Sequence, residues 1–115
     1  PNSERSSPWH TEVHQFRIEA GVEESGLPTP EGMHRDGVDW VCIVLIDRQN
    51  VASGVTKIID KDSGSMSQFT LTNPLDAVFL DDMRVHHAVT PISRLDSGQH
   101  GFRDVLVLTF RHDPA

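Results

Sequence analysis

The chain has 115 residues, of which 37% are hydrophobic and 23% charged, and its formal net charge at pH 7 is −7. These values are typical of a single globular domain. The negative charge and the lack of a Lys/Arg cluster argue against binding to nucleic acid or to an anionic membrane surface. Cys42 is the single cysteine, so no disulfide can form within the chain, and we expect a reducing, cytoplasmic compartment.

The N-terminal third alternates between loop and strand patterns. Residues 1–10 are polar and contain two prolines, which predicts a loose N-terminal arm. Apolar and polar residues alternate over residues 11–19, which predicts a strand with His14 at the surface. Residues 21–32 have the glycine and proline content of a loop.

The rest of the chain consists of short apolar segments separated by turns. Residues 40–46, WVCIVLI, are typical of a strand buried on both faces. We expect polar turns at 47–53 and 61–64 and further strands at 54–60, 66–71, 76–80, 84–92 and 103–111. Seven or eight short strands without helical periodicity predict an all-β sandwich or jelly roll, formed as one domain by residues 1–115.

The last predicted strand has the clearest alternation. If Arg103 points into the fold, so do Val105, Val107 and Thr109. The other face then carries three large apolar side chains, those of Leu106, Leu108 and Phe110. Such a patch is not left exposed as a rule, so helices outside this chain or a second subunit, in a homodimer, should cover it.

Two potential metal ligands stand just before the apolar run. His34 and Asp36 are two residues apart, and in extended backbone such residues face the same way. A third ligand is available from His86 or His87, between which strand parity cannot choose. Two His and one carboxylate form the ligand set of non-haem Fe(II) oxygenases. With seven His and 17 acidic residues in the chain, a His-x-Asp taken alone is more often a turn or a solvated pair.

The order His-x-Asp, distal His and then Arg103 at the head of a strand resembles the 2-oxoglutarate/Fe(II)-dependent dioxygenases. Within them it is similar to the bacterial free amino-acid hydroxylases of the L-isoleucine 4-hydroxylase type. The resemblance covers residues 13–111. It rests on PTPEGMHRDGVDWV (28–41), LDAVFLDDMRVHHAVTPI (75–92) and FRDVLVLTFR (102–111).

The resemblance implies a double-stranded β-helix, a cupin-like barrel, that lacks most of the usual N-terminal helical cover. It also implies that Fe(II) is bound by His34, Asp36 and His87, with 2-oxoglutarate and O2 as co-substrates. Arg103 matches the residue that pairs with the distal carboxylate of 2-oxoglutarate, and a planar guanidinium suits that role.

The activity that the resemblance implies is hydroxylation of a small molecule, a free L-amino acid, with release of succinate and CO2. Arg35, beside the triad, is a candidate for contact with a substrate carboxylate, and a solvent-facing charge is the other interpretation. Candidates for the pocket walls, which the core explains equally well, are Val41, Ile43, Val105 and Val107.

Two other functions fit the same residues. A cupin-type metalloenzyme would use the triad without 2-oxoglutarate and without Arg103. A non-catalytic or truncated jelly-roll binding module would use the outward apolar face as an interface. The resemblance is also weaker at residues 53–56, where relatives tend to be richer in glycine and acidic residues.

Overall fold

The computed structural model of the chain describes residues 8–113, and these residues form two facing antiparallel sheets. The larger sheet has the strand order β1 (Trp9–Ala20), β9 (Gly101–His112), β2 (Trp40–Gln49) and β6 (Ala77–Asp81). The smaller sheet has the order β5 (Met66–Phe69), β4 (Thr56–Asp60) and β7 (Val85–Val89). A third pair joins β3 (Val51–Ser53) to β8 (Ile92–Arg94).

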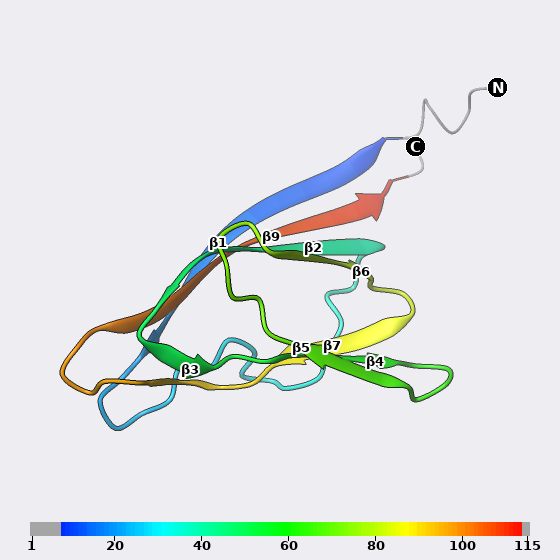
Figure 1. Ribbon diagram of the computed structural model, residues 1–115. Coiled ribbons are helices and arrows are strands. Elements are labelled where there is room, and N and C mark those ends of the chain that lie inside the picture. Colours follow the sequence, from blue (N-terminus) through cyan, green and yellow to red (C-terminus); the bar gives the residue numbers. More distant parts are fainter. Residues whose placement is uncertain (1–7, 114–115) are drawn as a thin grey trace.

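Figure 1 shows the larger sheet facing the smaller one, as in a jelly roll. The long pair β1 and β9 curves away from the smaller sheet at the end where β1 begins and β9 ends. The described residues contain no helix, so none of them forms a helix that could cross a membrane. The predicted all-β jelly roll is confirmed.

The predicted boundary between the N-terminal arm and the first strand differs from the observed one. Trp9 and His10, which the sequence places in the loose arm, belong to β1, where they pair with His112 and Arg111 of β9. The rest of the expected arm, residues 1–7, lies outside the described residues.

Two predicted elements were wrong, and each has a local cause. The turn expected at 47–53 contains the end of β2 and all of β3, because the chain only bends at Asn50, where φ is 53°, and then continues as a strand that pairs with β8. The single strand expected at 84–92 is divided into β7 and β8. Pro91 lies between them and has no N–H to donate to a strand ladder.

The core lies between the larger sheet and the smaller one. It is formed by buried apolar side chains of β2, β6 and β9 and of the loop after β5, namely Val41, Ile43, Leu45, Leu71, Leu80 and Val105. A smaller, separate cluster consists of Ala20, Val51 and Ile92, with Ile18 packed against them. Burial of this apolar surface is the main force that holds the two sheets together.

The outer side of the larger sheet carries apolar side chains that no described segment covers. Leu106, Leu108 and Phe110 lie on this side, as expected, because Val105, Val107 and Thr109 line the cavity on the other. A shallow groove on the same side is lined by four aromatic residues, Trp9, Trp40, Phe79 and Phe110. We call these four residues, together with Leu106 and Leu108, the outer apolar face. Trp9 is 50% exposed and Phe79 60%.

Candidate active site

The two imidazoles of the predicted triad are brought together by the backbone. The N–H of His34 donates to the carbonyl of His87 at 2.9 Å, and the N–H of His87 donates to the carbonyl of His34 at 2.8 Å. In an antiparallel pair, residues directly opposite each other carry their side chains on the same face. This isolated bridge therefore sets His87 beside His34, while His86 points the other way.

The three side chains converge on one point. The Nε2 atom of His34 lies 3.3 Å from Oδ1 of Asp36, and Nε2 of His87 lies 3.7 Å from Oδ2 of the same carboxylate. One ligand atom from each residue can be chosen so that all lie within 4.8 Å of one another. This spacing and this donor set suit a divalent first-row metal ion that keeps open coordination positions.

Local contacts leave the imidazoles able to bind metal through Nε2. The Nδ1 atom of His34 lies 2.9 Å from the carbonyl oxygen of Gly32, and a hydrogen bond there places the proton on Nδ1 and the free lone pair on Nε2. His87 is only 3% exposed. Burial, followed by the electrostatic effect of the neighbouring His34, lowers the pKa of His87, so its imidazole is neutral at neutral pH.

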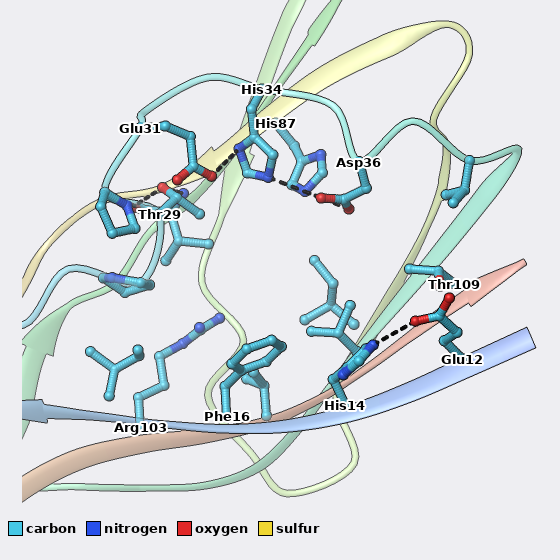
Figure 2. A pocket seen from close by; sticks show the side chains of 18 residues that line it. Glu12, His14, Phe16, Thr29, Glu31, His34, Asp36, His87, Arg103 and Thr109 are labelled. Atoms are coloured by element: carbon cyan, nitrogen blue, oxygen red, sulfur yellow. Dashed lines mark hydrogen bonds and ion pairs between the residues drawn. The ribbon is translucent and has the colours of Figure 1, made fainter.

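The triad lies at one side of a cavity of about 510 Å³ between the sheets. Figure 2 shows Glu31, His34, His87 and Asp36 on one side and Arg103, Phe16 and His14 on the other. Three of the four expected wall residues, Ile43, Val105 and Val107, do line the cavity. The fourth, Val41, is fully buried in the core instead.

Arg103 is a buried cation in the wall of this cavity. The residue is 2% exposed, and its Nε and Nη2 atoms have no hydrogen-bond partner among the described residues. Burial, and to a lesser extent the charge of Arg48, lowers the pKa of Arg103 to about 10, so it remains a cation at neutral pH. A buried, unpaired cation is costly. It therefore indicates that an anion binds there.

The inner face of β1 supplies two polar wall residues that the sequence did not identify. Glu12 and His14 both line the cavity. His14 was expected at the surface, and its side chain is 52% exposed, so it lies at the surface as expected and contributes to the cavity wall as well. Nε2 of His14 lies 3.0 Å from the Glu12 carboxylate, and Nε2 of His10 lies 2.8 Å from it. These hydrogen bonds, that of His10 first, lower the pKa of Glu12. Alternation with Phe16 and Ile18 was the signal that could have identified both residues.

Arg35 is not brought to the cavity. Its Nε atom lies 3.4 Å from the carboxylate of Asp82, and its Nη2 atom donates to the carbonyl of Val38 at 3.3 Å. This placement gives no support to the substrate contact expected for Arg35. The side chain instead belongs to the loop that carries the proximal ligands.

The fold and this donor set are those of the jelly-roll metalloenzymes with a two-His, one-carboxylate site. A family model described as 2OG-Fe dioxygenase matches residues 1–109, and the chain belongs to this family. The family predicted from the sequence is thus confirmed. Iron and 2-oxoglutarate, named in the family's description, are the cofactors that the sequence led us to expect.

Individual relatives agree with this assignment. The L-isoleucine-4-hydroxylase of Bacillus thuringiensis is 31% identical over 101 residues, a match that covers 87% of this chain and 41% of that protein. The crystal structure of a BsmA homolog from Methylobium petroleophilum PM1 has a TM-score of 0.81 and 43% identity, covering 93% of this chain and 44% of the other.

The crystal structure of IDO from Bacillus thuringiensis also has a TM-score of 0.81, with 26% identity. That match covers 95% of this chain and 51% of the other. The chain thus spans about half of the length of these relatives or less.

Proposed function

We propose that the chain carries the iron and 2-oxoglutarate centre of a dioxygenase that hydroxylates a small molecule. In this proposal His34, Asp36 and His87 bind Fe(II), and Arg103 binds the distal carboxylate of 2-oxoglutarate. The observation that carries the proposal is the buried, unpartnered guanidinium of Arg103 in the wall of the cavity that the triad also lines.

Arg103 is what separates this function from that of a metalloenzyme that does not use 2-oxoglutarate. A cupin-type enzyme with the triad alone would have no need of a cation that is 2% exposed and whose Nε and Nη2 atoms have no partner in the part of the chain that the structure describes. A dicarboxylate that chelates the metal at one end would supply the missing anion at the other. Two parallel hydrogen bonds to one carboxylate would then satisfy the free guanidinium N–H groups.

The roles of the chain are to bind, orient and exclude water. When bound, iron and 2-oxoglutarate supply the oxidation, in which O2 and 2-oxoglutarate yield succinate, CO2 and one oxygen atom for the substrate C–H bond. Ile43, Val105 and Val107 form an apolar part of the wall of the cavity that the triad and Arg103 also line. Such a wall limits the access of water to the reacting groups.

The substrate we propose is a free L-amino acid. A relative that is 31% identical is named as an L-isoleucine-4-hydroxylase. The cavity itself supports the proposal, because Glu12 lines it as an anion with a lowered pKa. A carboxylate at this position suits the ammonium group of an amino acid, with the side chain of the substrate directed at the metal.

We also propose that the chain acts as one jelly-roll domain in the cytoplasm, where its single Cys42 would stay reduced. A second copy of the chain is the partner that we propose for the outer apolar face. This face is self-complementary in character, being apolar and free of charge at its centre around Phe79 and Phe110. A two-fold pairing would bury the same patch on both copies.

An anaerobic titration tests the proposed function. Fe(II) and then 2-oxoglutarate are added to the protein while the visible metal-to-ligand charge-transfer band is followed. A band in the parent that is lost in Arg103→Ala would support the proposal. Iron binding without a band would favour the cupin-type function, and failure to bind iron would contradict an enzymatic role for this chain in favour of a binding module.

A further inference from the structure

Asp82 is a carboxylate buried completely, at 0% exposure, outside the set of predicted ligands. It follows the end of β6, in the connection that leads into β7 and so to His87. Buried carboxylates are rare unless several groups compensate their charge. The partners of Asp82 therefore indicate why the fold keeps it.

All of these partners belong to the loop that carries the proximal ligands. The backbone N–H of Asp36 donates to Oδ1 of Asp82 at 3.0 Å. The N–H groups of Gly37 and Val38 donate to Oδ2 at 2.8 and 3.0 Å. Three successive amides thus surround one carboxylate, as in the backbone nests that bind anions.

The backbone of the loop is shaped for this contact. Gly37 has φ of 80°, a left-handed conformation that glycine adopts without strain. A Cβ at this position would meet nothing within 4 Å, so the backbone angle alone explains the glycine. Glycine here lets three amides in a row turn toward the same acceptor.

Two further contacts join the loop to the connection. The guanidinium of Arg35 lies 3.4 Å from the Asp82 carboxylate and supplies a compensating charge. The N–H of Asp82 in turn donates to the carbonyl of Asp39 at 3.0 Å. Asp82 therefore binds the loop 35–39 both through its side-chain carboxylate and through its backbone N–H.

We propose that Asp82 is a positioning residue that holds the Asp36 carboxylate in its ligand geometry before any metal binds. The inference rests on the metal site of the proposed function and adds a residue to it. The connection that contains Asp82 also delivers His87, so one segment sets the distal ligand and the backbone of a proximal one.

The β4–β5 turn provides matched control variants. There Asp60 accepts backbone hydrogen bonds from Asp62 at 2.9 Å and from Ser63 at 3.1 Å. Gly64 in the same turn has φ of 73° and also nothing near its Cβ position. This turn reproduces the carboxylate, the amides and the left-handed glycine, and it contains none of the predicted ligands.

The first experiment compares the affinity of four variants and the parent for Co(II), followed by its visible ligand-field bands. In Asp82→Asn an amide NH2 replaces one acceptor oxygen, so a donor of the loop loses its partner. Gly37→Ala disturbs the same contact from the loop side. We expect both to weaken Co(II) binding by about 10- to 100-fold and to alter the bands. Asp60→Asn and Gly64→Ala should lower the stability of the fold but leave the Co(II) affinity and the bands unchanged.

A second experiment needs no variant. Amide hydrogen exchange, measured by NMR on the metal-free parent, should show Asp36, Gly37 and Val38 protected as well as the central strands. Unprotected amides would overturn the proposal, as would a folded Asp82→Asn that binds Co(II) within twofold of the parent. If Asp82→Asn does not fold, Gly37→Ala decides by the same criterion.

These outcomes are distinct from a failure of the proposed function. A parent that binds Co(II) but shows no charge-transfer band with 2-oxoglutarate would contradict the dioxygenase proposal and leave the role of Asp82 intact. A parent that binds no metal would contradict both.

Discussion

Arg48 and Arg103 stand directly opposite each other in the ladder between β2 and β9, and within residues 8–113 they differ in their hydrogen-bond partners. The guanidinium of Arg48 donates to the carbonyls of Val51 at 3.2 Å and Ser53 at 2.9 Å. Arg103 is the more buried of the two and has no such acceptor at Nε or Nη2. Two guanidinium cations thus lie side by side, and the Arg103 guanidinium has free N–H donors. Such an arrangement suits the binding of an anion.

Replacement of Arg103 by lysine tests this interpretation. Lysine keeps the positive charge but cannot make two parallel hydrogen bonds to one carboxylate. We expect 2-oxoglutarate to bind about 10- to 100-fold more weakly to Arg103→Lys, the equivalent of one or two charge-assisted hydrogen bonds. Isothermal titration calorimetry on the Fe(II)-loaded protein under anaerobic conditions measures the change.

Arg111→Lys is the matched control for this prediction. Arg111 lies on the same strand but is exposed near its end and does not line the cavity. We expect its affinity for 2-oxoglutarate to equal that of the parent. If Arg103→Lys bound 2-oxoglutarate as tightly as the parent does, the guanidinium would not bind the co-substrate through two parallel hydrogen bonds.

The sequence predicts much of the site because the alternation of β9 is a local property. Once one residue of that strand faces inward, the faces of Arg103, Val105 and Val107 follow from the pleat. His34 and Asp36 are likewise placed together by their spacing. The division of the strand expected at 84–92 had a local signal as well, in Pro91, because proline cannot continue a ladder.

The remaining features depend on contacts between distant segments. The bridge between His34 and His87 decides which of two adjacent histidines faces the cavity, and no pattern within 84–92 contains it. From the sequence, Asp82 is one acidic residue in a predicted turn. Its burial results from the loop that folds over it, and this loop is distant in the sequence. The roles of such residues depend on tertiary contacts, and the neighbouring sequence does not predict them.

The two adjacent histidines give a direct test of the triad. His87→Ala removes a buried imidazole whose Nε2 faces Asp36, and we expect Fe(II) affinity to fall by about 100-fold or more with loss of the charge-transfer band. His86→Ala removes the neighbour on the opposite face and should leave both unchanged. Anaerobic Fe(II) titration followed by absorbance distinguishes the two. A reversed result would place the metal on the other side of β7.

Glu12 offers a test of the proposed substrate class. Glu12→Gln keeps the size of the side chain and removes the anion, so a zwitterionic substrate should lose its ammonium partner. We expect KM for an accepted L-amino acid to rise about tenfold, with the 2-oxoglutarate affinity unchanged, as for the loss of one charge-assisted hydrogen bond. Succinate release in the presence of a panel of L-amino acids measures KM. An unchanged KM would remove Glu12 from the substrate site.

The core predicts a stability difference between two leucines. Leu45 is fully buried in the core, whereas Leu95 is 70% exposed in the loop before β9. Leu45→Ala should destabilise the fold by about 2–5 kcal/mol, because it leaves a cavity between the sheets. Leu95→Ala should change stability by about 0.5 kcal/mol or less. Urea unfolding followed by tryptophan fluorescence compares them, and similar midpoints would contradict the observed core.

Cys42 gives the outer apolar face a chemical probe with a defined pH dependence. The residue faces Phe79 of β6 and Leu108 of β9 in the ladder, and its burial raises the pKa of the thiol. Because the thiolate is the reactive form, a raised pKa lowers the rate of alkylation at any pH below it. Between pH 7 and 9 we expect iodoacetamide to modify the native protein more slowly than the urea-unfolded chain, with the rate still rising at pH 9.

The proposed second copy adds a concentration dependence to this rate. If two copies pair through the outer apolar face, dilution should separate them and speed the alkylation of Cys42. Phe79→Ser, which removes a side chain that is 60% exposed on this face, should give a monomer by sedimentation velocity and a fast rate at every concentration. A parent that sediments as a monomer, with an alkylation rate independent of concentration, would exclude the pairing, because the face would then be uncovered in both forms.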